Sequence, residues 1–274
     1  MRLVVIGDFH GTFPEKLKKR VLKEKPDYIL CIGDYSDSTE YRKLVFKHWE
    51  ELKKKPLKKI IDKKVYARIL KRRENSVKEL LKEINKMGIK VLSITGNGES
   101  IEKFTVNEIK ELFKKFKNID LVYNKIVDLE DWKIMGICSY RGASSKRKAY
   151  RGLKNAVKMV YMNNKWDHIL RKLFLKMKDS KKTIFLAHEP PLNTKLDLIN
   201  NPESPMDGKH LGDEYFRKYV EKYQPALMVC GHFHENQGTE KLGKTLIVNC
   251  GAAQAGEAAV IEIGEKIKVK FLKN

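Results

Sequence analysis

Residues 2–10 read RLVVIGDFH, an apolar run that ends on a glycine and is followed by two potential metal ligands. A short run rich in Val, Ile and Leu is typical of a strand that is buried on both faces, as in a mostly parallel sheet. In open α/β sheets, ligand sites lie beyond the carboxyl ends of the strands. The stretch therefore predicts a buried strand that delivers Asp8 and His10 to a site at its end.

The same arrangement recurs four more times along the chain. The further donors are Asp34 after DYILCIG (27–33), Asn97 after KVLSITG (90–96), His188 after TIFLA (183–187), and His232 and His234 after ALMVCG (226–231). Together the five motifs supply three carboxylate or amide side chains and four imidazoles. Such mixed N/O donors suit two adjacent divalent cations, and no packing requirement produces this set.

Taken in order, Asp-x-His, Gly-Asp-x-x-Asp, Gly-Asn, a lone His and Gly-His-x-His resemble the motifs of the calcineurin-like metallophosphoesterase superfamily. The resemblance extends from residue 3 to about residue 250, which is nearly the whole chain. It implies an α/β fold, namely a four-layer α-β-β-α sandwich of two mixed sheets with metal ligands at the ends of strands. We expect a single domain over residues 1–274, with helical insertions at about 38–86 and 141–182.

The resemblance also implies a role for each donor. Asp8, His10 and His234 are expected to bind a first metal ion, Asp34 to bridge, and Asn97, His188 and His232 to bind a second. In an extended Asp-x-His or His-x-His stretch, side chains i and i+2 point the same way, so each pair can face one centre. The mixed ligands admit Mn, Fe, Zn, Ni or Co.

The Gly-Asp-x-x-Asp motif contains two carboxylates, those of Asp34 and Asp37. Two close cations require a negative group between them, which makes the carboxylate of Asp34 the candidate bridge and the central catalytic residue. Asp37 ends the same motif, and we expect it only to cap or brace the loop.

The chain departs from the family pattern at Gly98. Many relatives carry Gly-Asn-His-Glu or Gly-Asn-His-Asp, and their His assists phosphate binding and protonation of the leaving group. A missing general acid typically costs roughly 10²–10⁴-fold in rate. His210, between two glycines in a loop, is a candidate substitute, although an exposed loop histidine is the commoner explanation. Glu99 is a weaker candidate, because a carboxyl acid needs a raised pKa.

The net charge of +22 is concentrated in two segments. Residues 38–86 contain 17 basic and 7 acidic side chains (+10), and residues 141–182 contain 14 basic and 2 acidic ones (+12). These helical segments are either solvated faces or a surface that binds phosphate backbones. The candidate contacts for nucleic acid or phosphate are Arg141, Lys146, Arg147, Lys148 and Arg151.

Composition restricts the remaining possibilities. No run of 18 apolar residues is present, so we expect no membrane span. The four cysteines lie in or beside apolar runs and form no Cys-x-x-Cys pair, which indicates reduced, buried thiols in a cytoplasmic protein. Abundant Lys and Glu with only three Gln residues suit a thermophile. An insertion helix offers a contact for a homodimer.

These observations predict a dinuclear-metal phosphoesterase in which a metal-bridging hydroxide attacks phosphorus in line. A phosphodiester is preferred, because Gly98 resembles relatives that lack the monoesterase-type His. One alternative is a nuclease or RNA-processing phosphodiesterase that uses the basic insertions. The other is a metal-loaded, non-catalytic module that binds nucleic acid or protein, but the retention of all seven donors argues against it.

Overall fold

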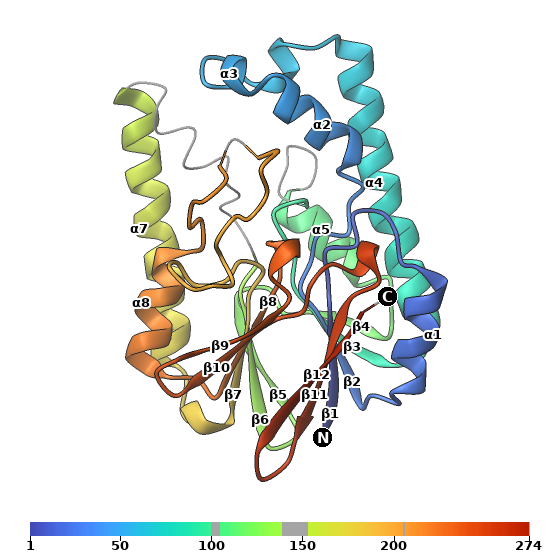
Figure 1. Ribbon diagram of the computed structural model, residues 1–274, viewed down its shortest axis with the longest axis vertical. Helices are drawn as coiled ribbons and strands as arrows, with labels where there is room; N and C mark the ends of the chain where they lie inside the picture. The colour runs from blue at the N-terminus through green and yellow to red at the C-terminus, as the bar shows by residue number, and fades with distance from the viewer. Residues whose placement is uncertain (100–104, 139–152, 205, 274) are drawn as a thin grey trace.

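The computed structural model describes residues 1–99, 105–138, 153–204 and 206–273. Two six-stranded mixed sheets pack face to face, and helices cover the outer surface of each (Figure 1). The fold is therefore the expected α/β sandwich with the four layers α-β-β-α.

The first sheet has the strand order β12-β11-β1-β2-β3-β4. Its strands are β1 (Arg2–Ile6), β2 (Tyr28–Cys31), β3 (Lys90–Ser93), β4 (Ile119–Leu121), β11 (Ala258–Ile263) and β12 (Ile267–Leu272). Strands β1 to β4 are mutually parallel, while β11 runs antiparallel to both β1 and β12. The loops that follow β1, β2 and β3 consequently leave the same edge of this sheet.

The second sheet has the order β5-β6-β7-β8-β10-β9. Its strands are β5 (Lys125–Leu129), β6 (Trp132–Gly136), β7 (Thr183–Leu186), β8 (Leu227–Cys230), β9 (Gly238–Leu242) and β10 (Thr245–Asn249). The four central strands are parallel, and β5 and β9 pair antiparallel at the two edges. Neither edge strand ends in one of the five donor motifs on which the sequence analysis relied.

Alternation along the strands explains the layers. In β1, Val4 and Ile6 join a core beneath helices α1, α4 and α5, whereas Leu3 and Val5 join the core between the sheets. Successive side chains of a strand point to opposite faces, so a strand that is apolar throughout must be covered on both sides. The helices on this side are α1 (Glu15–Lys23), α4 (Lys63–Lys86) and α5 (Val106–Phe113).

The other outer face is covered by α7 (Leu153–Leu175) and α8 (Glu214–Tyr223). Trp166, Leu170 and Phe174 of α7 pack with Phe216 of α8 against Phe185 of β7. Aromatic side chains bury large areas, and here they form edge-to-face contacts that favour one arrangement of the two helices on the sheet.

The basic segment 38–86 is helical, as the spacing of its apolar residues predicts. It forms α2 (Thr39–Lys47), the short α3 (Trp49–Leu52) and α4, and Pro56 lies between α3 and α4. Helices α2 and α3 lie beyond the end of the sandwich, next to the upper part of α4 (Figure 1). Helix α4 begins at the cap Asp62, whose side chain accepts from the N–H groups of Lys64 and Val65.

None of the helices in the described ranges combines the length and apolar character needed to cross a lipid bilayer.

The core between the sheets provides a matched test of the packing. Leu186 of β7 is fully buried there, whereas Leu175 at the end of α7 is 62% exposed. We expect Leu186→Ala to lower the free energy of unfolding by about 2–5 kcal/mol, because it leaves a cavity in close-packed surroundings. Leu175→Ala should stay within about 0.5 kcal/mol of the parent. Urea unfolding at equilibrium measures both, and equal losses would contradict the layered core.

Candidate metal centre

Five loops meet at the carboxyl edges of the two sheets, after β1, β2, β3, β7 and β8. Backbone hydrogen bonds join them in pairs. The N–H of Asp8 donates to the carbonyl of Gly33 (3.0 Å), and that of His10 donates to Asp34 (2.9 Å). In the second sheet, the N–H of Gly231 donates to the carbonyl of His188 (2.9 Å). Segments far apart in the sequence are thereby held at one site.

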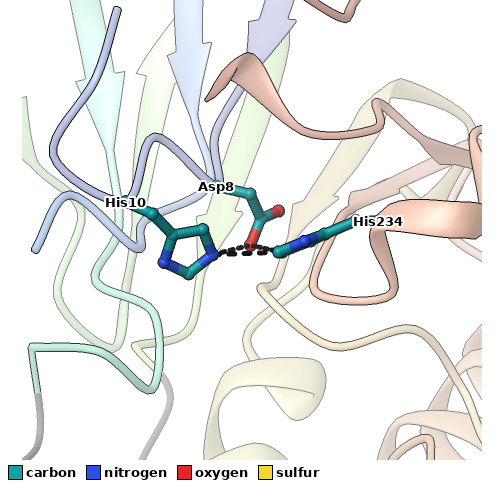
Figure 2. A group of neighbouring side chains, drawn as sticks. All are labelled: Asp8, His10 and His234. Carbon is teal, nitrogen blue, oxygen red and sulfur yellow. Dashed lines mark hydrogen bonds and ion pairs between the residues drawn. The ribbon is translucent and has the colours of Figure 1, made fainter. Parts of the chain in front are cut away.

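A first group of donors consists of Asp8, His10 and His234 (Figure 2). Asp8 Oδ1 lies 3.3 Å from His234 Nε2 and 3.8 Å from His10 Nε2. The two ring nitrogens lie 3.0 Å apart. All three atoms therefore face one small volume.

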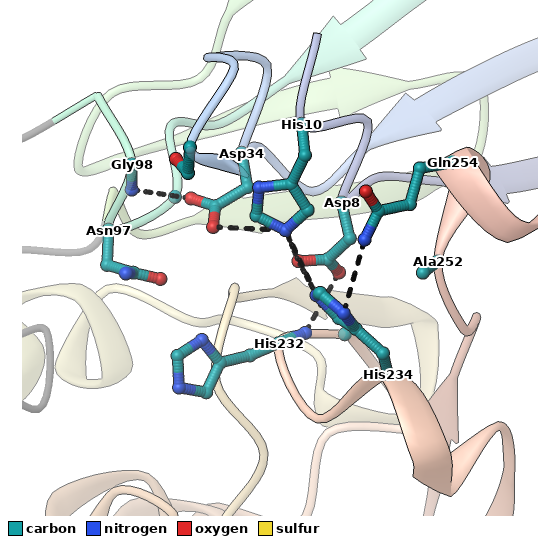
Figure 3. A network of polar contacts seen from close by, with 12 residues as sticks. Asp8, His10, Asp34, Asn97, Gly98, His232, His234, Ala252 and Gln254 are labelled. Carbon is teal, nitrogen blue, oxygen red and sulfur yellow. Dashed lines mark hydrogen bonds and ion pairs between the residues drawn. The ribbon is translucent and has the colours of Figure 1, made fainter. Parts of the chain in front are cut away.

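A second group is centred on His188. Its Nε2 atom lies 2.9 Å from Asn97 Oδ1, 3.2 Å from His232 Nδ1 and 3.5 Å from Asp34 Oδ1. Figure 3 shows Asn97, Asp34 and His232 beside the first group. The structure thus brings together all seven donors that the sequence singled out.

Asp34 lies between the two groups. Its Oδ2 atom is 3.9 Å from His10 Nε2, while its Oδ1 atom faces His188 and accepts the N–H of Gly98 at 2.6 Å (Figure 3). Asp8 also contributes to both groups, since its Oδ1 is 3.9 Å from His188 Nε2. The other oxygen of Asp8 accepts the N–H of His232 (2.9 Å), which fixes its orientation.

The chemistry of these atoms fits metal ions. His188 Nδ1 lies 2.8 Å from the carbonyl oxygen of Ile32, which can only accept, so Nδ1 carries the proton. In the neutral ring, Nε2 is then a lone pair that faces the acceptor oxygens of Asp34 and Asn97. A metal ion among these atoms would be ligated by all three of them. A ring nitrogen that donates to a backbone carbonyl is also the usual support of a metal-binding histidine.

Electrostatics favour ionised carboxylates and a neutral His10 at this site. Burial raises the pKa of Asp8, but His188 and His234 outweigh it and hold that pKa at about 2. The pKa of Asp34 is lowered against burial by His188 and His10. Burial lowers the pKa of His10 to about 4.

The pKa values of His232 and His188 shift in opposite directions. Burial, aided by His188, lowers the pKa of His232 to about 3. His188 itself shifts upward, because Asp34 and Asp8 outweigh its burial. Ionised carboxylates and neutral imidazoles are the forms that ligate metal ions, and a bound cation would favour neutral His188 as well.

The backbone of the donor loops is not extended, so the geometric reason given for the Asp-x-His and His-x-His spacing was wrong. Asp8, His10, Asp34 and His232 adopt left-handed conformations with φ of 53°, 44°, 56° and 71°. His234 begins a short 3₁₀ helix (His234–Asn236). Such conformations cost of order 1–3 kcal/mol each and occur mainly at functional sites, where the surroundings enforce them.

Glu99 supports the donor loops and does not face the centre as an acid would. One of its carboxyl oxygens accepts from the N–H groups of Asp34 (3.0 Å) and Gly96 (2.9 Å), and the other accepts from Tyr35 (2.8 Å) and Ser36 (3.1 Å). Burial and the charge of Asp34 raise its pKa to about 7, but all four bonds favour the ionised form. This geometry argues against the expectation that Glu99 replaces the missing general acid.

His210 lies on the loop between β7 and α8 and belongs to neither donor group in the described chain. Its Nδ1 atom is 2.7 Å from Oδ1 of Asp197, a fully buried carboxylate that also accepts the N–H groups of Thr194 and Gly212. The His210 side chain is 37% exposed. The sequence analysis did not identify Asp197, because a single Asp in a loop carries no pattern.

Asp37, the last residue of the Gly-Asp-x-x-Asp motif, lies between β2 and α2. Asp37 braces the loop, as expected, since it accepts from the N–H of Thr39 (3.0 Å) and from Arg72 Nε (2.6 Å). A buried arginine of α4, Arg73, also contacts these loops and was not identified from sequence. The candidate phosphate contacts Arg141, Lys146, Arg147, Lys148 and Arg151 lie outside the described residues.

Comparison with known proteins agrees with this site. Residues 1–273 match the family described as "Metallophosphoesterase, calcineurin superfamily". An uncharacterised protein of Methanocaldococcus jannaschii is similar, with 25% identity over 253 residues that cover 91% of this chain and 87% of that protein.

Solved structures share the fold at low identity. A dimetal phosphatase from Danio rerio superposes with a TM-score of 0.58 at 11% identity, over 100% of this chain and 96% of that one. The protein TT1561 of Thermus thermophilus gives a TM-score of 0.51 at 13% identity, over 98% and 97% of the two chains. These similarities concern the arrangement of the two sheets.

Gly33 allows a test of how closely the donor loops approach. It has φ of 91°, and a Cβ there would lie 2.0 Å from the backbone nitrogen of Gly96. Gly88 also has positive φ (72°), but a Cβ there would meet nothing within 4 Å. We expect Gly88→Ala to cost about 1–2 kcal/mol of unfolding free energy, from backbone conformation alone. Gly33→Ala should cost clearly more in urea unfolding, and a smaller loss than in Gly88→Ala would contradict the packing.

Proposed function

The chain belongs to the calcineurin superfamily of metallophosphoesterases, and on this premise we propose that it is a dinuclear-metal phosphoesterase that prefers phosphodiesters. The observation that carries the proposal is the position of Asp34, whose two carboxylate oxygens face histidines of the two donor groups, His10 and His188. A carboxylate shared in this way offsets the repulsion between two neighbouring cations.

In this proposal the donors divide between two ions. Asp8, His10 and His234 would hold the first, Asn97, His188 and His232 would hold the second, and Asp34 would be shared between them. The placement of Asp8 Oδ1 between both groups supports a compact pair of ions. When bound, two divalent cations lower the pKa of a water molecule and stabilise charge on the phosphoryl oxygens.

The protein residues contribute orientation and protection from water. Ile32 fixes the ring of His188 by accepting from Nδ1, and Glu99 fixes the loops that carry Asp34 and Asn97. Because the donors Asp8, Asp34 and His188 are almost entirely buried, their charges act in a medium that screens them weakly. The site is therefore organised before a substrate arrives.

We assign protonation of the leaving group to His210, with Asp197 as its positioning residue. A carboxylate at Nδ1 holds the ring in one orientation, so Nε2 is the nitrogen left to transfer the proton. The loop is tied to the metal-binding segment, because Leu198 pairs with His210 and its carbonyl accepts from Asn236, two residues after His234.

The preference for diesters rests on Gly98. A Cβ at this position would lie 2.9 Å from Asp34 Oδ1 and 2.8 Å from Ser36 Oγ, so no side chain fits there in this loop conformation. The chain consequently lacks the histidine that relatives use toward the more highly charged monoester. A diester carries one negative charge fewer on its phosphate, and needs less neutralisation.

Hydrolysis of bis(p-nitrophenyl) phosphate with added Mn²⁺ tests the metal chemistry. We expect activity to disappear with chelator, to return with metal, and to exceed that on p-nitrophenyl phosphate in kcat/KM. Asp34→Asn should lower kcat/KM by roughly 10³-fold, because the shared negative charge is lost, and should reduce bound metal measured by mass spectrometry.

Asp120→Asn is the matched control, since Asp120 is exposed on β4 and pairs only with Lys90 in the described structure. It should leave both readouts unchanged. Full activity and two bound metal ions in Asp34→Asn would refute the bridging role.

The acid role of His210 predicts a dependence on the leaving group. His210→Ala should slow hydrolysis of a phenyl phosphodiester by roughly 10²-fold or more, because the more basic phenolate needs a proton. The p-nitrophenyl diester, with its better leaving group, should lose much less. His168→Ala, an exposed histidine on α7, is the control. Equal losses on both substrates would show that His210 is not the acid.

A further inference from the structure

Arg73 is a charged side chain on the buried stripe of α4. It follows Ile69 and precedes Val77 at intervals of four residues, so it faces the core together with these apolar side chains. Only 4% of its surface is exposed. Arginine is seldom buried to this extent unless its guanidinium is paired or has a specific role.

The guanidinium contacts both central donor loops. Its Nη2 donates to the carbonyl oxygen of Gly98 (2.6 Å) and to Ser36 Oγ (3.1 Å), and its Cζ lies over the ring of Tyr41, 4.8 Å from the centroid. The N–H of Gly98 in turn donates to Asp34 Oδ1. One residue therefore separates the guanidinium from the carboxylate that lies between the two donor groups.

The second terminal nitrogen of the guanidinium, Nη1, does not take part in these contacts. Nη1 is buried and has no hydrogen-bond partner among the residues that the structure describes. A buried donor of a charged group without a partner is destabilising. If Arg73 served only to brace the loops, Nη2 alone would suffice, and nothing would offset the cost at Nη1.

The close packing around Gly98 explains why the position of Arg73 matters. A side chain on Gly98 would have to displace the side chains of Asp34 and Ser36, and the loop presents no cationic residue at this position. The guanidinium of Arg73 bonds to Gly98 itself, and thus brings a permanent positive charge from another element to the same place.

We propose that Arg73 contacts the substrate, with Nη1 donating to a non-bridging oxygen of the phosphate held at the donor groups. This inference rests on the proposed function, because it presupposes that a phosphate ester binds there. Arginine suits the role, since its planar fork can hold the loop with one nitrogen and a phosphate oxygen with another. The cation–π contact with Tyr41 adds a further hold on the guanidinium.

Calorimetric titration of the Mn²⁺-loaded protein with inorganic phosphate tests the proposal without requiring turnover. We expect Arg73→Met to keep both metal ions and to weaken phosphate binding by roughly 10–10²-fold, because one charge-assisted contact is lost. Arg73→Lys, which retains the charge without the fork, should bind phosphate with intermediate affinity. Lys71→Met removes an exposed charge from the same helix and should change nothing.

The outcomes separate the possible roles. Unchanged phosphate affinity in Arg73→Met with intact metal content would overturn the proposal. Loss of metal in both Arg73 variants would also overturn it, because Arg73 would then be a brace for the loops. If the parent protein binds phosphate but hydrolyses no ester, the proposed function fails, and weakened phosphate binding in Arg73→Met still supports the contact.

Discussion

The burial of many ionisable side chains at one point is the constraint on which the rest of the structure depends. Asp8 and Asp34 lie beside four imidazoles, and the Nε2 atoms of His10 and His234 approach to 3.0 Å. Such an arrangement persists only where the surrounding loops cannot relax. Several of these residues are held in left-handed backbone conformations, each of which costs of order 1–3 kcal/mol. The strain is located where cations can offset it.

The loops are held by buried carboxylates that are not themselves ligands. Glu99 accepts four backbone N–H groups and so ties the loop after β2 to the loop after β3. Asp197 does the same within the loop between β7 and α8, and adds His210. Each replaces the backbone pairing that irregular loops lack, because a buried N–H needs a partner. The donor set is therefore surrounded by a second set of charges with a structural role.

Sequence reasoning predicts the central strands and the seven donors because both rest on strong local patterns. The central strands are almost continuously apolar, whereas the edge strands β5 (KIVDL) and β9 (GTEKL) are short and mix apolar with polar residues, so their pattern is weaker. The prediction that Asp8 and His10 face one centre is correct. The left-handed backbone that brings them together depends on contacts with the loop after β2, which no single sequence reveals. Arg73 was detectable in principle, as a charge at an apolar position of the α4 stripe.

The charge of the first basic segment divides into two parts that act over different distances. All seven of its acidic side chains are engaged, either in ion pairs or, for Asp62, in capping α4. These exposed pairs add little stability, and the excess cations face solvent. Their field attracts anions but is screened by salt within about 8–10 Å.

Arg73 is the only basic side chain of residues 38–86 that is buried, so its charge acts at short range and is screened far less. The exposed lysines can therefore raise the local concentration of phosphate esters without orienting them, whereas orientation requires the fixed guanidinium.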